Sequence, residues 1–386
     1  MTAPAAPRSR RALARPAAAG AATSARSLAA PPILVRQVRN GIEESVHRGD
    51  VVEVDTAGRV VRVLGNPDRV VTLRSCAKPF GVVALIEAGG IDAFALQPHE
   101  LAIMASSHSG EDSHVRTIQG MLRRANLSQT LIATGSEGMP LDPLTASRLA
   151  RDGEKAGAIR HMCSGQHTVS LLLSKLRGWD PSDYWHDDHP SQVAYRSAVA
   201  RAFGTVPGRL VTAIDGCGVN TYAFPLREVA RAYAFLADPD ALAAKDPRAS
   251  VAAPLRVVRD AMLAHPEMVG GSHDRLDTSL MKALPGRVVS KAGMEALRGM
   301  AILPGPRGGR HTGASGLAVK IEDGDGHDRA TWAASVEALR QAGVLDGQPL
   351  RMLARYHRPL ILDPHGRVGA EAIASFELAP IGELIR

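Results

Sequence analysis

R-S-C-A-K-P-F, residues 74–80, lies where the sequence changes from strand-like to helix-like periodicity. Alternating apolar residues over 51–73 predict a β-hairpin, and the apolar run that follows predicts a buried helix over 75–89. Ser75 precedes Lys78 by one helical turn, and this spacing places the two side chains on one face. A serine hydroxyl becomes a nucleophile when a neighbouring base removes its proton. The stretch therefore predicts a nucleophile beside its own base.

The chain contains a second Ser-x-x-Lys, from Ser279 to Lys282, and the two copies cannot both be catalytic. Asp277 and Thr278 precede the second copy and are good helix caps, so a solvated helix start accounts for it. The first copy instead joins a strand to an apolar helix, which directs its side chains into the interior. Burial or a nearby cation would lower the pKa of the lysine and allow it to act as a base.

Length and composition indicate a large folded domain with a short extension before it. The chain has 386 residues, of which 45% are apolar, and this is enough for a large core. The net charge of +7 is uneven, because residues 1–30 hold five arginines and no acid. We predict a disordered Arg/Ala/Pro-rich extension over 1–30, with targeting or contact with a nucleic acid or membrane as alternatives. We predict a single catalytic domain over 31–386, with a helical lobe over roughly 95–265.

The composition argues against several kinds of partner. Aromatic residues make up 4% of the chain, too few for a platform that stacks nucleic-acid bases. No run of about 18 apolar residues occurs, so we expect no membrane span. The three cysteines, Cys76, Cys163 and Cys217, and the lack of a secretion signal favour a reducing compartment. We predict a cytoplasmic protein without nucleic-acid or membrane partners.

Strand patterns at both ends of the chain enclose a helical middle. Residues 34–73 show strand-like alternation, and so do 287–293 and 316–322 in the last third. Between them, apolar periodicity predicts several helices, among them one over 190–203 that begins at a proline. Terminal strands of this kind join one sheet. We therefore predict an α+β fold, in which a largely antiparallel sheet is flanked by helices and the helical lobe is inserted.

Small and polar residues concentrate at four turns and one strand. Glycine and serine there allow a close approach of backbone and substrate, although each turn alone is also consistent with an ordinary chain reversal. The segments are 74–78, 105–112, 161–167, 213–218 and the K-A-G strand at 290–293.

Taken in order, these segments resemble a known family, the rhizobial-type (class 3) L-asparaginases, whose fold is similar to that of serine β-lactamases and glutaminases. The resemblance covers roughly 35–360, and its specificity comes from the combination of short motifs rather than from any one of them. The motifs are R-S-C-A-K-P-F itself, L-G-N-P-D-R at 64–69, S-S-H-S-G-E-D at 106–112, C-S-G-Q-H at 163–167, D-G-C-G at 215–218, A-H-P-E-M-V-G at 264–270, S-K-A-G at 290–293 and V-K-I-E-D-G at 319–324.

The resemblance implies catalytic roles for four residues. Ser75 would be the nucleophile and Lys78 its partner. Ser107 would complete a proton relay with Lys78 or Lys291. Lys291 would hold charge near the substrate, as the lysine of a K-T-G strand does in the lactamase-like fold, and would help to lower the pKa of Lys78. Two lysines this close would titrate as a coupled pair.

The resemblance also implies a zinc site beside the substrate, at Cys163 and Cys217 with Asp215 nearby. The family motif is C-S-G-K-H and its lysine is a zinc ligand, but this chain has Gln166 at that position. A neutral amide is a weak zinc ligand compared with a thiolate or an imidazole. Two outcomes stay open: a zinc ion held by the two thiolates with His167 as a replacement ligand, or two reduced thiols without metal.

Free asparagine carries an ammonium and a carboxylate, and several residues are candidates to bind them. Arg74 is a candidate for the carboxylate because its guanidinium can bind both oxygens, although an ordinary cation at a strand end is the alternative. Glu111 and Asp215 are candidates for the ammonium. His108, in the same turn as the second serine, and His167 are further candidates for contact with the substrate.

We therefore predict an L-asparagine amidohydrolase that releases L-aspartate and ammonia through an acyl-enzyme, and the resemblance suggests a homodimer. One alternative is another Ser-x-x-Lys amidase, of the glutaminase or of the β-lactamase and penicillin-binding type. The lack of an S-x-N triplet at Ser107 argues against the latter type. The second alternative is a non-catalytic amino-acid-binding protein of the same fold. One methylene changes discrimination by only ~1–3 kcal/mol, so the sequence leaves asparagine and glutamine both open.

Overall fold

The computed structural model describes residues 30–135, 139–308 and 310–381. The predicted disordered extension over 1–30 lies outside the described residues, except for Ala30. A compact folded unit begins at Pro31. Within the described ranges, every helix is too short or too polar to span a membrane.

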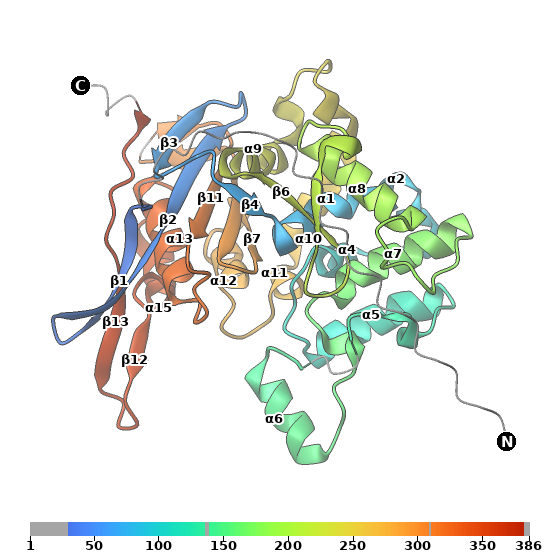
Figure 1. The fold of residues 1–386 in the computed structure, drawn as a ribbon, viewed down its shortest axis with the longest axis horizontal. Coiled ribbons are helices and arrows are strands. Elements are labelled where there is room, and N and C mark those ends of the chain that lie inside the picture. The colour runs from blue at the N-terminus through green and yellow to red at the C-terminus, as the bar shows by residue number, and fades with distance from the viewer. Residues whose placement is uncertain (1–29, 136–138, 309, 382–386) are drawn as a thin grey trace. The chain divides into compact units, whose positions relative to one another are not determined.

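Strands from both ends of the chain form the main sheet, which has eight strands in the described residues (Figure 1). They lie in the order β12-β13-β1-β2-β11-β8-β7 with β3 paired to β2, and these pairings are antiparallel. The predicted hairpin within 51–73 is the β2–β3 pair. The strands are β1 (Ile33–Arg39), β2 (Ile42–Asp55), β3 (Val60–Leu64), β7 (Val288–Gly293), β8 (Leu297–Ile302), β11 (Ser315–Ile321), β12 (Leu360–Leu362) and β13 (Val368–Ala374).

Alternation along these strands gives the sheet two apolar faces. Val52 and Ala318 pack into a core that is shared with the helical lobe. Their neighbours Val51 and Leu317 face the other way and join a second core with α12 (Leu276–Ala283) and α13 (Arg329–Gln341). The sheet is therefore covered by helices on both faces, as the predicted α+β architecture requires.

Helix α9 (Leu226–Ala237) packs closely on the face shared with the lobe. Two glycines of the sheet make this possible, because a Cβ at Gly316 would clash with the backbone of Ala230 and one at Gly299 with the ring of Tyr233. The Tyr233 hydroxyl donates to the carbonyl of Cys76 at 3.0 Å. The sheet, α9 and the turn that carries Ser75 are thus held together.

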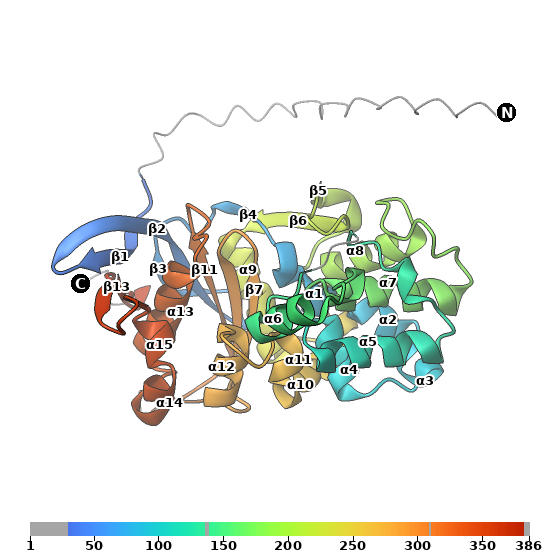
Figure 2. The ribbon, with the colours of Figure 1, turned by 90° about the horizontal axis from the view of Figure 1, so that it is seen from below.

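Most of the other helices form the lobe beside the sheet, and Figures 1 and 2 both show α2, α5, α7 and α8 grouped there. The helix predicted from Pro190 is confirmed as α8. The helices are α1 (Lys78–Gly81), α2 (Val83–Glu87), α3 (Gly90–Phe94), α4 (Pro98–Met104), α5 (Asp112–Arg124), α6 (Pro143–Asp152), α7 (Ser164–Arg177), α8 (Pro190–Ala202), α10 (Ala252–Ala264), α11 (Pro266–Val269), α14 (Gly347–Met352) and α15 (Ala354–His357).

Two small sheets complete the described strands. One has the order β4-β6-β5 and the other is the pair β9-β10. Their strands are β4 (Val70–Thr72), β5 (Val211–Ile214), β6 (Asn220–Pro225), β9 (Gly305–Arg307) and β10 (Arg310–Thr312). Because β4 leads directly into the Ser75 turn, its pairing with β6 fixes where that turn begins.

The prediction of one helix over 75–89 is wrong. The segment is a 3₁₀ turn, Arg74–Ala77, followed by the separate short helices α1 and α2. Pro79 accounts for the boundary between the 3₁₀ turn and α1, because a proline has no N–H to donate to the carbonyl one turn earlier. The boundary between α1 and α2 lies at Val82. Side chains three residues apart eclipse each other in a 3₁₀ turn, so Ser75 and Lys78 still share one side.

The second Ser-x-x-Lys differs in detail from the prediction of a solvated helix start. Helix α12 begins at Leu276, so Ser279 lies within it, and Asp277 and Thr278 are buried helical residues rather than caps. The Ser279 hydroxyl is 2.9 Å from the hydroxyl of Tyr356. Lys282 is exposed. Ser279 therefore has a packing contact and Lys282 a solvated position.

Candidate active site

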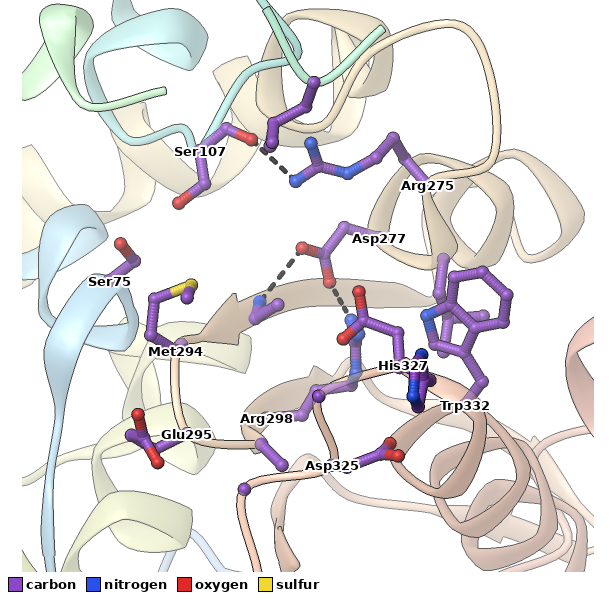
Figure 3. Close-up of a pocket in the computed structure, with 18 of the residues that line it drawn as sticks. Ser75, Ser107, Arg275, Asp277, Met294, Glu295, Arg298, Asp325, His327 and Trp332 are labelled. Atoms are coloured by element: carbon purple, nitrogen blue, oxygen red, sulfur yellow. Dashed lines mark hydrogen bonds and ion pairs between the residues drawn. The ribbon is translucent and has the colours of Figure 1, made fainter. Parts of the chain in front are cut away.

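Ser75 and Ser107 border the same pocket, which has a volume of about 410 Å³. Ser75 comes from the 3₁₀ turn before α1 and Ser107 from the loop after α4. Figure 3 shows the two serines at one side of the pocket and His327 and Trp332 at the other. The β7–β8 turn contributes the adjoining wall. A cavity of this size is within the usual range for a small-molecule site.

The Ser107 hydroxyl lies between two buried lysine amines. Ser107 Oγ is 2.8 Å from the Nζ of Lys291 and 3.3 Å from the Nζ of Lys78. Both lysine side chains are fully buried. Lys291 comes from β7 and Lys78 from the start of α1. The structure thus brings together Ser107, Lys78 and Lys291, at a pocket that Ser75 also borders.

Lys78 is bound to the Ser107 loop and to a thiol. Its amine donates to the carbonyl of Ser106 at 2.7 Å, to Ser107 Oγ at 3.3 Å and to Cys163 Sγ at 3.2 Å. An ammonium has three N–H groups, and these three acceptors match them. The geometry suits a charged donor that holds Ser107 in place, whereas the sequence suggested a base for Ser75.

Lys291 has a different environment. Besides Ser107, its amine contacts the carbonyl of Ala292 at 2.6 Å. Burial lowers the pKa of Lys291 to about 7, and the charge of Asp277 opposes part of this fall while that of Lys78 adds to it. A neutral amine has two N–H groups and a lone pair, so Lys291 can donate to the carbonyl of Ala292 while its lone pair faces the Ser107 hydroxyl and accepts that proton. Lys291 is therefore the better candidate for a general base near neutral pH.

Asp277 joins this cluster, and the sequence analysis missed its role. Its carboxylate accepts hydrogen bonds from Ser290 Oγ at 2.6 Å and from the backbone N–H of Ala292 at 2.9 Å, and it pairs with Arg298. Burial alone would raise the pKa of Asp277, but Arg298, Lys291 and these hydrogen bonds hold it at about 2. No local signal indicated this role, because all of its partners lie on β7 and β8.

The turn that carries Ser75 is held in an unusual conformation. Arg74, directly before Ser75, has a left-handed backbone with φ of 46°, and its N–H donates to Thr221 Oγ1 at 2.8 Å. Strand β7 passes close by, since a Cβ at Gly293 would lie 2.8 Å from the carbonyl oxygen of Leu73. Of the first N–H groups of this turn, that of Arg74 is bonded to Thr221 and that of Cys76 donates to the carbonyl of Leu73 at 2.9 Å. The N–H of Ser75 is therefore the candidate to bind an oxyanion.

Arg74 and Asp215, two of the predicted substrate-binding residues, are paired with each other. The guanidinium of Arg74 contacts Asp215 Oδ1 through Nε at 2.8 Å and through Nη2 at 2.7 Å. This hydrogen bonding raises the pKa of Arg74. Neither residue is among the described residues that border the pocket. Each charge already has an opposite charge beside it, which weakens its attraction for a substrate group.

His108 has a structural place behind the Ser107 loop. Its Nδ1 accepts a hydrogen bond from the N–H of Gly110 at 3.0 Å, so its proton is on Nε2. Nε2 contacts Ser164 Oγ at 2.8 Å, and that hydroxyl in turn donates to the carbonyl of Ile159. Burial lowers the pKa of His108 well below its usual range. The side chain therefore fixes the loop as a neutral imidazole.

Glu111 and His167 also make internal contacts. The carboxylate of Glu111 accepts hydrogen bonds from the backbone N–H of Ser272 at 2.6 Å and from its hydroxyl at 2.9 Å. His167 is fully buried and its Nδ1 is 2.5 Å from the hydroxyl of Tyr184. Burial lowers the pKa of His167 to about 3. These contacts hold loops around the pocket together.

The two predicted zinc ligands lie side by side, but they fit a zinc ion poorly. A hydrogen bond from the Cys217 thiol lowers the pKa of Cys163, and the same contact raises the pKa of Cys217. Within the described ranges, no third cysteine, histidine or carboxylate joins them with all ligand atoms within 4.8 Å of one another. Lys78 also donates to Cys163, and Gln166 supplies only a neutral amide. The zinc site stays a prediction.

Several residues that border the pocket were not predicted at all. They are Arg275 at the start of α12, Met294 and Glu295 in the β7–β8 turn, and His327 and Trp332 beside α13 (Figure 3). One signal was present in the sequence, because D-G-D-G-H at 323–327 has the same small and polar character as the other four turns. Arg275, Met294, Glu295 and Trp332 lie in segments whose composition gave no such signal.

Comparison with known proteins places the chain in a family. The family model described as L-asparaginase II matches residues 35–373, and no curated protein matches the chain. A solved structure of Mglu in its native form in the presence of 4.3 M NaCl is 14% identical at a TM-score of 0.34, covering 78% of this chain and 63% of that one. A probable glutaminase from Bacillus subtilis complexed with 6-diazo-5-oxo-L-norleucine is 9% identical at a TM-score of 0.37, covering 77% and 84%. These structural similarities are too weak to carry an argument, whereas the family match confirms the resemblance seen in the motifs. The chain belongs to the L-asparaginase II family.

Proposed function

We propose that the protein hydrolyses L-asparagine to L-aspartate and ammonia through an acyl-enzyme on Ser75. The observation that carries the proposal is the Ser107 hydroxyl, held between the buried amines of Lys291 and Lys78 at the wall of a pocket that Ser75 shares. Such an arrangement costs stability, because two amines are buried near each other. It is useful where a proton must move between a nucleophile and a base.

The first half of the reaction uses this relay. The substrate carbonyl lies about 3 Å from Ser75 Oγ. As Ser75 attacks, its proton passes to Ser107, and the proton of Ser107 passes to neutral Lys291. Lys78 keeps donating to Ser107 and holds its hydroxyl in line. The N–H of Ser75, at the start of its turn, stabilises the negative oxygen of the tetrahedral intermediate.

The second half reverses the proton flow. Lys291 returns its proton through Ser107 to the nitrogen of the leaving group, so ammonia departs and an ester remains on Ser75. Water then attacks this ester and gives its proton to the same relay. Ser75 regains a proton as L-aspartate leaves, which restores the starting state.

Two measurements test the proposal. The first is ammonia release from a panel that contains L-asparagine, L-glutamine and other linear amides, with the colour change of the β-lactam nitrocefin followed in parallel. The second uses hydroxylamine, which intercepts an acyl-enzyme and would yield the hydroxamate of L-aspartate in place of part of the L-aspartate. Hydrolysis of asparagine without any hydroxamate would contradict the acyl-enzyme.

The panel also separates the alternatives. Preference for glutamine would indicate a glutaminase. Turnover of nitrocefin without ammonia release from the amides would indicate an enzyme of the β-lactamase type. A thermal shift with amino acids but no turnover would indicate a binding protein. The homodimer and the cytoplasmic location suggested by the sequence stay predictions.

A further inference from the structure

Two arginines border the pocket, and they differ in their partners. Arg298 pairs with the buried carboxylate of Asp277. Arg275 has no carboxylate within 4.0 Å among the described residues. Its guanidinium instead donates from Nη1 to Ser109 Oγ at 3.0 Å and from Nη2 to the carbonyl of Ser107 at 2.7 Å. The hydrogen-bond partners of Arg275 are thus neutral, and the carboxylates of Asp277, Asp328 and Glu111 act on its charge from farther away.

The environment of Arg275 favours an anionic ligand. A guanidinium has five N–H groups, and the two bonds above leave three of them. Burial lowers the pKa of Arg275, which means that the protein removes solvent from this cation without supplying a counter-ion in contact. A desolvated cation without a partner is costly, and a bound anion offsets that cost.

The place of Arg275 relates it to the reaction. It binds the main chain of Ser107, whose hydroxyl forms the proposed relay with Lys291. In Figure 3 its side chain runs along the wall of the pocket toward Ser107, on the far side of the opening from Glu295. An anion bound by Arg275 therefore lies in the same pocket as the reacting amide.

We propose that Arg275 binds the α-carboxylate of the substrate and so restricts the enzyme to amides that carry a free carboxylate. This inference rests on the proposed function. Arg74, the candidate from the sequence, is less suited to the task because Asp215 already neutralises it and because it does not border the described pocket. A planar guanidinium can bind both oxygens of a carboxylate, which gives orientation as well as affinity.

The test compares two substrates in matched variants. L-Asparagine and 3-aminopropanamide differ only in the α-carboxylate, so the ratio of their kcat/KM values measures recognition of that group. We expect Arg275→Gln to lower this ratio about 100-fold, mainly through KM for asparagine, as loss of charge-assisted hydrogen bonds implies. Arg74→Gln is the matched control. It should retain most of the ratio of the two kcat/KM values, even if it changes kcat/KM for both substrates.

Three results would overturn the inference. The first is an equal loss with both substrates in Arg275→Gln, which would mean that Arg275 only supports the Ser107 loop. The second is a collapse of the ratio in Arg74→Gln with the ratio intact in Arg275→Gln. The third concerns Arg275→Lys, which keeps the charge without the planar fork and should lose about 10-fold for asparagine. If Arg275→Gln does not fold, Arg275→Lys alone decides. An unchanged ratio of kcat/KM values in Arg275→Lys would contradict the inference.

A binding measurement separates this inference from the proposed function. Calorimetry on the Ser75→Ala protein compares L-asparagine with 3-aminopropanamide, with and without Arg275→Gln. If the wild-type enzyme releases no ammonia but binding of asparagine still depends on Arg275, the function fails and the inference stands. If asparagine binds equally with and without Arg275, or does not bind at all, the inference fails.

Discussion

Replacing Lys291 by methionine should abolish activity and yet stabilise the fold. The pKa of Lys291 is lowered from 10.5 to about 7 because the amine is buried. At 1.36 kcal/mol per pKa unit, a protonated Lys291 costs the folded protein about 4–5 kcal/mol. Methionine fills a similar volume without a charge. The variant loses the hydrogen bond to the carbonyl of Ala292 and one of the two to Ser107, worth about 1 kcal/mol each. We expect a net gain in the free energy of unfolding of about 2–3 kcal/mol at pH 7.

The sign of the pH dependence makes this prediction specific. Below pH 7 both the folded and the unfolded chain carry the proton on Lys291, so the cost is fully present. Between pH 7 and pH 10.5 only the unfolded chain holds it, so the stability of the wild-type protein rises with pH across this window. The variant lacks this contribution. Its advantage should therefore shrink from pH 7 to pH 9.5.

Urea unfolding at pH 6.5, 8 and 9.5, together with ammonia release from L-asparagine, measures both effects. Lys282→Met is the matched control, because Lys282 is an exposed lysine of the second Ser-x-x-Lys and its loss should change stability by less than about 0.5 kcal/mol. A Lys291→Met protein that is less stable than the wild type at pH 6.5, or a difference that does not vary with pH, would refute the assignment of Lys291 as a buried amine that is neutral above pH 7.

Four further outcomes follow from the same geometry. Ser75→Ala should remove ammonia release while circular dichroism and the melting temperature stay close to wild type, and residual turnover would point to another nucleophile. Ser107→Ala should lower kcat by about 10²–10⁴ as a general-base relay is lost, so an unchanged kcat would exclude the relay. The kcat/KM of the wild-type enzyme should rise about tenfold per pH unit up to pH 7 and then level off, because Lys291 must be neutral; a flat profile from pH 5 to 8 would contradict this. Gln166→Lys should raise the zinc content found by metal analysis, and equal content in both proteins would show that the two cysteines do not form the inferred site.

What the sequence could predict was mainly local. The hairpin of β2 and β3 follows from alternation, and the helix that begins at Pro190 follows from the fixed φ of proline. The single helix predicted over 75–89 is divided at two places. Pro79 accounts for the first, the change from the 3₁₀ turn to α1, which apolar periodicity alone does not register, and the second lies at Val82. A 3₁₀ turn and an α-helix both place residues three apart on one side, so Ser75 and Lys78 still share a side. The hydrogen bonds of Lys78, however, go to Ser106, Ser107 and Cys163 rather than to Ser75.

The contacts between distant segments could not be derived from pattern. The register of β7 against β8 decides that Asp277 meets Arg298 and that Lys291 faces Ser107, and register depends on how the whole sheet packs. The resemblance supplied the identities of Ser107 and Lys291, but not which lysine is the charged donor. The sequence also did not indicate that oppositely charged candidates pair with each other. It suggested that Arg74 binds the substrate, whereas in the structure Arg74 pairs with Asp215.

The two lysines around Ser107 illustrate how one fold can give similar side chains different tasks. Lys78 donates to three acceptors, which are the carbonyl of Ser106, Ser107 Oγ and Cys163 Sγ, so its amine is placed as a hydrogen-bond donor. Lys291 has two acceptors and a carboxylate that is already bound to Arg298, so burial dominates and favours the neutral amine. Division of this kind allows a donor and a base to act on one hydroxyl at the same pH, which a symmetric pair of lysines could not do. It follows that substitution of a residue that contacts one of these lysines, with both lysines kept, should also impair the relay. Asp277 is the most informative of these residues, because its charge opposes the fall in the pKa of Lys291, which would otherwise lie below about 7.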